Sequence, residues 1–218
     1  MATMDGGGGD DSIDGTSGDD TVAGNGGADT IRGQAGSESL AGDDGHDDIY
    51  SDGGDDTIHG GDGDDYIEGG SGNDSVDAGD DWDTVSGGDG HDSIDGGSGS
   101  DDLYGGDGDD TIEGGQGEDW VFGGAGRDSL SGGDGNDTVV GEEGRDTLYG
   151  GAGDDTVSGH EGDDALHGGA GSDGLYGGSG DDYYDVGADA DHYYMDRDAG
   201  GGSNDPGESD RDVIRFEP

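Results

Sequence analysis

Acidic residues recur at every ninth position along most of this chain, and their carboxylates are its best candidates for chemistry. The residue is Asp in 19 of the 20 repeats and Glu in the other. The series comprises Asp11, Asp20, Asp29, Glu38, Asp47, Asp56, Asp65, Asp74, Asp83, Asp92, Asp101, Asp110, Asp119, Asp128, Asp137, Asp146, Asp155, Asp164, Asp173 and Asp182. Because carboxylate oxygens bind hard cations such as calcium and magnesium, this column points to metal ligation.

A glycine-rich loop precedes each acid and adds a second kind of oxygen ligand. Gly stands two residues before the acid in 19 of 20 repeats, the exception being Asp81. Glycines allow a tight turn that leaves carbonyl oxygens exposed, and about six to eight oxygens on a flexible loop suit calcium better than magnesium. Candidate carbonyl ligands include Gly60, Gly61, Gly63, Gly69, Gly70, Gly72, Gly87, Gly88, Gly90, Gly105, Gly106 and Gly108.

An apolar residue follows each acid at a distance of two, from Ile13 through Leu175 to Tyr184. This single ladder is thin, since only 24% of residues are hydrophobic and the net charge is -53. A chain of this composition cannot offset the entropy of ordering by apolar burial alone. We therefore expect a calcium-free coil and a calcium-bound folded state, with folding coupled to binding.

The full repeat, Gly-Gly-x-Gly-x-Asp-x-apolar-x, is complete in residues 60–68 and 105–113. Over residues 6–185 the chain resembles the repeats-in-toxin (RTX) family of calcium-binding nonapeptide repeats. The resemblance implies an all-β fold, a right-handed parallel β-roll or β-solenoid of about ten 18-residue turns. In such a roll the x-apolar-x triplet is a short strand and the other six residues of each repeat form the turn.

The resemblance also implies where calcium binds, namely between the loops of successive turns. The sixth-position acids of neighbouring turns would be shared ligands, for example Asp56 with Asp74, Asp65 with Asp83 and Asp92 with Asp110. Twenty repeats make two columns of ten loops with nine gaps each, which leaves room for up to about 18 calcium ions.

Some repeats depart from the pattern at the glycine positions. Position two holds Thr16, Asn25, Gln34, Asp43, Asp52, Glu142 and His160. Asn and Asp tolerate a positive φ, whereas Thr does not readily do so, so the first five or so sites are expected to be weaker. Glu38 should hold its ion differently from Asp. Repeat 78–86 has lost two glycines and carries Trp82 in its loop, so we expect this site to be distorted or empty.

Alternate repeats share a face, and the two faces differ. One carries Tyr50, Tyr66, Tyr104, Trp120, Phe122, Val140 and Tyr176, and the other carries Thr21, Ser39, Thr57, Ser75, Ser93, Thr111, Ser129 and Thr147. Aromatic and β-branched residues suit strands without further meaning, but the aromatic face is also suited to self-association or glycan binding. Ice binding through the Ser/Thr face is a weaker alternative, because positions three and five lack regular Thr and Asn.

Catalysis is not indicated by any residue cluster. The six His are scattered, and the absence of Cys excludes disulfides and thiol chemistry. We therefore expect a protein that is not an enzyme, and one that does not bind nucleic acid, which its negative charge repels.

Residues 1–5 are expected to form an N-terminal extension, and 186–218 a C-terminal cap and possible secretion segment with a last strand over 212–216. No apolar run marks a membrane span or an N-terminal signal peptide. The resemblance implies a secreted protein, located outside the cell or at its surface, where calcium is plentiful. The acidity also suits a halophile.

Overall fold

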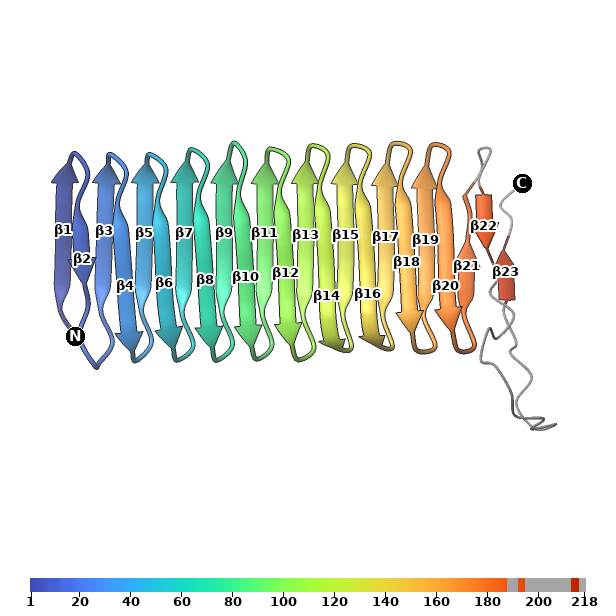
Figure 1. Ribbon diagram of the computed structural model, residues 1–218, viewed down its shortest axis with the longest axis horizontal. Coiled ribbons are helices and arrows are strands. Elements are labelled where there is room, and N and C mark those ends of the chain that lie inside the picture. The colour runs from blue at the N-terminus through green and yellow to red at the C-terminus, as the bar shows by residue number, and fades with distance from the viewer. Residues whose placement is uncertain (188–191, 195–212, 216–218) are drawn as a thin grey trace.

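The computed structural model describes residues 1–187, 192–194 and 213–215. In these residues the secondary structure is all β, arranged as a parallel solenoid. Successive strands alternate between a 12-stranded and an 11-stranded sheet, which lie face to face along the length of the molecule (Figure 1). The all-β roll expected from the sequence is therefore confirmed. The described residues include no helix long and apolar enough to cross a bilayer.

Odd-numbered strands form the 12-stranded sheet, in the order in which they follow along the chain. They are β1 (Thr3–Gly8), β3 (Thr21–Gly26), β5 (Ser39–Asp44), β7 (Thr57–Asp62), β9 (Ser75–Asp80), β11 (Ser93–Ser98), β13 (Thr111–Gln116), β15 (Ser129–Asp134), β17 (Thr147–Ala152), β19 (Ala165–Ala170), β21 (Tyr183–Asp185) and β23 (Val213–Arg215).

Even-numbered strands form the 11-stranded sheet in the same way. They are β2 (Ser12–Asp14), β4 (Thr30–Ala35), β6 (Asp48–Gly53), β8 (Tyr66–Ser71), β10 (Thr84–Asp89), β12 (Asp102–Asp107), β14 (Trp120–Gly126), β16 (Thr138–Gly144), β18 (Thr156–Glu161), β20 (Gly174–Ser179) and β22 (His192–Tyr194).

The register confirms two repeats per turn, because each residue of the roll pairs with the residue 18 positions away. Thr57 pairs with Ser75 and Ile58 with Val76, for example. The strands are longer than the expected triplet, since most contain six residues. The reason is that the following Gly-Gly-x segment also pairs with the next turn, as Gly61 does with Gly79.

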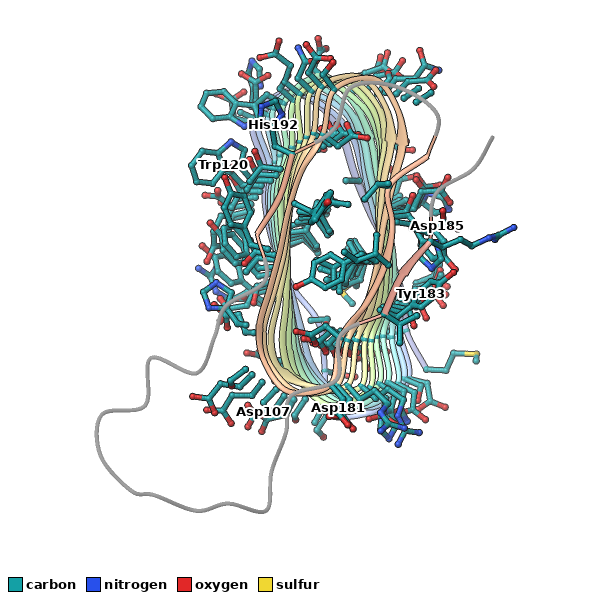
Figure 2. The ribbon with its side chains drawn as sticks, turned by 90° about the vertical axis from the view of Figure 1, so that its right-hand side faces the viewer. Asp107, Trp120, Asp181, Tyr183, Asp185 and His192 are labelled. Carbon is teal, nitrogen blue, oxygen red and sulfur yellow. The ribbon has the colours of Figure 1, made fainter. Side chains whose placement is uncertain are left out.

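The core is the apolar ladder, seen end-on between the two sheets in Figure 2. Its side chains are at most 2% exposed from Val22 to Tyr184. The two sheets contribute alternate members, so Ile58 and Val76 belong to one sheet and Ile67 and Val85 to the other. The core is therefore one side chain deep on each sheet, as the composition predicts.

The roll extends beyond the expected boundaries at both ends. Strand β1 begins at Thr3, within the segment expected to be an extension, because Met4 lies nine residues before Ile13 and takes an apolar position paired with Val22. At the other end Tyr193 pairs with Leu175. The expected last strand is confirmed over Val213–Arg215, which pairs with β21; residues 212 and 216 lie outside the described residues.

The outer faces differ as expected, but not completely. The Ser and Thr column is continuous on the 12-stranded sheet from Thr21 to Thr147. The aromatic residues named above lie on the 11-stranded sheet, whose outer face carries the labelled Trp120 in Figure 2. However, the 12-stranded sheet also has an exposed ring, Tyr149, which stacks on His167 with 4.6 Å between centroids.

Candidate metal centre

The acids of the ninefold column lie at the turns and are buried. From Asp20 to Asp182 each is at most 3% exposed, whereas Asp11 at the first turn is only partly buried. The burial follows from the fold, because the acid comes two residues before a core side chain and so faces the inside of the turn. Buried acids of this kind are rare unless a partner compensates their charge.

From Asp20 onward, one oxygen of each Asp in the column has a backbone partner in the preceding turn. The Asp56 N–H donates to Asp74 Oδ1 over 2.9 Å, Asp65 N–H to Asp83 Oδ1 over 2.8 Å, and Asp92 N–H to Asp110 Oδ1 over 2.8 Å. The structure thus brings together the pairs that were expected to share an ion. These bonds orient the carboxylates and stack them along the roll.

The second oxygen of most of these carboxylates is buried and has no hydrogen-bond partner. This holds for Oδ2 of Asp29, Asp47, Asp56, Asp65, Asp74, Asp83, Asp92, Asp101, Asp110, Asp119, Asp128, Asp137, Asp146, Asp155 and Asp164. An unpaired buried carboxylate oxygen is strongly unfavourable. Since an oxygen of this kind has only a cation left as a partner, the residues fit a resident metal ion.

A backbone carbonyl of the neighbouring turn lies close to this unpaired oxygen, as the surroundings of Gly87 show. A Cβ added to Gly87 would lie 2.4 Å from Asp92 Oδ2 and 2.8 Å from the Gly105 carbonyl oxygen. No group of three or more His, Asp or Glu side chains in the described part of the chain could hold a metal, so an ion here must take carbonyl ligands. Such a mixed oxygen set suits calcium.

The glycines of positions two and four keep the loop carbonyls stacked from turn to turn. Gly61 and Gly63 have φ values of 128° and 121°, which L residues rarely adopt. A Cβ on Gly108 would lie 1.6 Å from the Gly90 carbonyl oxygen. All twelve glycines predicted to supply carbonyls lie in these loops; which of their oxygens bind calcium stays a prediction.

Burial changes the acidity of the column. It raises the pKa of Asp65 to about 7 and that of Asp83 to about 8, and the backbone hydrogen bond that each accepts offsets this only in part. The next largest effect on Asp83 is the negative charge of Asp101 in the following turn. Without a cation, the folded chain therefore resists ionisation of these groups.

Glu38 differs from the Asp residues in its contacts, and how it would hold an ion stays a prediction. Both of its carboxylate oxygens are buried without a partner. Burial is the main cause that raises its pKa to about 7, followed by Asp56. A longer side chain at this position thus leaves two oxygens, rather than one, for an ion.

Thr16 is the exception that the sequence singled out. It does not adopt the positive φ found at Asn25, Gln34, Asp43 and Asp52, and strand β2 ends early at Asp14. Its N–H and its hydroxyl each donate to Asp20 Oδ2 over 2.7 Å, which is the main reason that the pKa of Asp20 is lowered. The chain itself therefore occupies the oxygen that other repeats leave for a cation, a role that the sequence analysis missed.

Repeat 78–86 is not distorted, so that expectation was wrong for the backbone. Val85 pairs regularly with Ile67 and Leu103, because Asp81 adopts the required positive φ of 81°. What differs is Ala78 at position one, where every other repeat except 51–59, which has Ser51, carries a glycine. Whether this site holds an ion stays a prediction.

A second set of turn contacts was also missed by the sequence analysis. Side chains at position five accept the N–H of position five in the following turn, as Asp109 does from Arg127 over 2.9 Å and Asn73 does from His91 over 3.0 Å. Asp, Asn, Ser and His all serve as acceptors here, which is why no single residue type marks the column. These contacts are exposed and need no metal.

Together, the parallel solenoid and its column of buried acids define a calcium-binding repeat protein. Comparison with family models agrees, since the RTX calcium-binding nonapeptide repeat matches residues 5–40, 32–67, 41–76, 59–94, 77–112, 95–130, 131–166 and 158–193. The chain belongs to this family over most of its length. A search of curated proteins found none that matches.

The raised pKa values predict how pH acts on the calcium-free chain. The pKa values of Asp65 and Asp83 are about 7 and 8 in the roll, whereas the pKa of an Asp in the unfolded chain is near 3.8. The ion-free roll is therefore least stable above pH 8 and gains stability as pH falls. Far-UV circular dichroism of calcium-depleted protein should show more β structure at pH 5 than at pH 8; less β structure at pH 5 would contradict the assignment.

Proposed function

We propose that this protein is a calcium-dependent folding module in which calcium ions join successive turns of the roll. The observation that carries the proposal is the row of buried carboxylate oxygens without a partner. Calcium binding at these oxygens would supply the interaction energy that the thin apolar core lacks. Metal binding would then be part of the folding free energy itself.

Electrostatics supports a large number of ions. The net charge of the chain is -53, and neighbouring carboxylates stack with the strand spacing of about 4.8 Å. One ion in each gap between loops would give up to about 18 ions for the 20 repeats. Such loading would remove about two thirds of the negative charge and leave a soluble acidic surface.

Calcium should switch the chain between a coil and the roll. In calcium-free buffer at pH 7.5 we expect a coil spectrum by circular dichroism, and a parallel β spectrum after calcium is added, because the ionised column then gains its partners. Titration calorimetry should give more than ten ions per chain. Magnesium is the control and should act far less well. An unchanged spectrum on adding calcium would rule out coupled folding.

One acid of the column can be tested alone. Asp110 lies between Asp92 and Asp128, so Asp110→Asn removes charge from two gaps and should lower the ion count by one or two. It should also destabilise the calcium-loaded roll by about 3 kcal/mol in chemical denaturation. Asp107→Asn is the matched control, because Asp107 is exposed in the same loop. Equal effects of the two substitutions would mean that burial in the column does not matter.

The proposed need for calcium suggests where the module folds and what role it has. A chain that needs many calcium ions to fold would stay unfolded in the cytosol and fold in the extracellular medium or at the cell surface. We propose a secreted structural or binding role without catalysis. The acidity is explained by ligation together with solubility, which also suits a salt-rich medium.

A second candidate function uses the aromatic side chains of the 11-stranded sheet. The rings of Tyr104 and Phe122 are stacked with 5.1 Å between centroids. The ring of Trp120 packs beside Phe122, with 6.2 Å between their centroids. Exposed stacked rings are suited to self-association or to glycan binding. The Ser and Thr column of the other sheet is the weaker candidate, for ice.

The second candidate has a direct test. Changing Tyr104 and Trp120 together to Ser should weaken calcium-dependent association, measured by analytical ultracentrifugation, or retention on a glycan array. Thr111→Ser on the other sheet is the control and should leave both unchanged. If the double variant also leaves both unchanged, the aromatic residues serve the sheet alone.

A further inference from the structure

A hollow of about 290 Å³ lies on the outer side of β6, β8 and β10, next to the turn that precedes these strands. The wall residues that matter for a ligand are His46, Asp48, Asp64, Tyr66, Trp82 and Thr84. The lining also includes Asp47 and Asp65, which belong to the column of buried acids. The hollow spans three successive turns, so a ligand there would contact side chains from all three.

Two aromatic rings border the hollow and face solvent. Trp82 is 58% exposed and Tyr66 is 39% exposed. The backbone of Trp82 is fixed by its N–H, which donates to Asp64 Oδ1 over 3.2 Å. A large exposed indole contributes nothing to this core, and it stands at position five, where most other repeats have a small or polar side chain. The rings therefore offer a surface for a ligand.

The polar groups of the hollow are negative. Asp48 and Asp64 bring two carboxylates, and the one imidazole in the lining, that of His46, accepts the Asp64 N–H at its Nδ1 over 2.7 Å. Burial, and then the charges of Glu68, Tyr50 and Asp48, raise the pKa of the Tyr66 phenol. The hollow thus joins π faces to negative charge.

The same sheet contains a cation that interacts with both an aromatic ring and a carboxylate. Arg32 lies between Asp14 and Tyr50 in one column of the outer face. Its guanidinium carbon is 5.3 Å from the ring centroid of Tyr50, and its Nη1 is 3.9 Å from Asp14 Oδ1. Tyr50 in turn contacts Tyr66, with 5.8 Å between centroids. One turn further along, rings and carboxylates recur, but none of the residues that line the hollow is Lys or Arg.

We propose that this hollow binds an organic cation, the guanidinium or ammonium group of a basic partner. A cation over a ring face and beside carboxylates gains from both. A neutral sugar would use the rings but would gain nothing from the two negative charges, which is why a cation fits better. The site lies on the acidic outer surface, so it is a function separate from holding calcium.

The two tryptophans make the test specific. Trp82 and Trp120 are the only Trp residues, so a ¹⁵N-labelled sample gives two indole signals, which single substitutions assign. With saturating calcium and 0.15 M NaCl, acetyl-Gly-Arg-Gly-amide should shift the Trp82 signal and leave the Trp120 signal in place. The same peptide with citrulline, which is neutral and has nearly the same shape, should shift neither.

Variants then connect the signal to the named groups. Asp48→Asn should weaken peptide binding by roughly two- to fivefold, as expected for one exposed charge, and Trp82→Ala by about fivefold or more, because the ring is lost. Trp120→Ala is the matched control and should leave the affinity unchanged. Circular dichroism with calcium shows whether each variant keeps the roll, so a loss of binding is not confused with unfolding.

Three outcomes would overturn the proposal. Equal shifts of both indole signals would mean that the peptide binds the acidic surface without preference. An equal effect of the citrulline peptide or of methyl glucoside on Trp82 would mean that the ring selects shape and not charge. No shift at millimolar peptide would mean that the hollow is only a feature of the surface. Each result leaves calcium-dependent folding untouched, so the two ideas fail separately.

Discussion

The structure depends on a carboxylate that recurs along the roll and has, in most repeats, a hydrogen-bond partner for only one of its two oxygens. From Asp29 onward, each Asp of the column accepts one backbone N–H from the preceding turn, and for most of them the other oxygen is buried without a partner. At the strand spacing of about 4.8 Å and an effective dielectric constant near 20, two adjacent like charges repel by roughly 3 kcal/mol. A hydrogen bond contributes only about 1 kcal/mol net. The protein groups alone therefore cannot hold an ionised column inside the roll.

This constraint explains why the loops are built from glycine. The acidic oxygen lies where a Cβ at position one would stand, as Gly87 shows against Asp92, and a cation must reach that oxygen together with loop carbonyls. Parallel sheets are usually covered by helices on both faces. Here the two sheets cover each other on one side only (Figure 2), so the roll lacks a second layer of apolar packing among the described residues.

The period of nine predicted the apolar core, and the resemblance to the RTX family added the two-repeat turn that sets the sheet register. Both follow from which face a residue occupies, whereas the burial of the acids was not predicted. Details that depend on neighbouring turns were not predictable. Asp81 keeps a regular backbone in repeat 78–86, since the turns on either side fix its conformation, whereas Thr16 sits near the open end of the roll and changes the loop. Met4 was missed because no acid two residues before it marks the repeat.

The turns are held by two ladders that run in opposite directions. At position six the N–H donates to the carboxylate of the following turn, as from Asp92 to Asp110, and at position five it donates to the side chain of the preceding turn, as from Arg127 to Asp109. The outer ladder uses protein groups alone and is interrupted where position five is Ala28, Trp82, Arg127 or Arg145, whereas the inner one leaves one oxygen of most of its acids without a partner. The exposed side chains of the outer ladder therefore help to specify the register, whereas the inner ladder needs a partner for its buried oxygens.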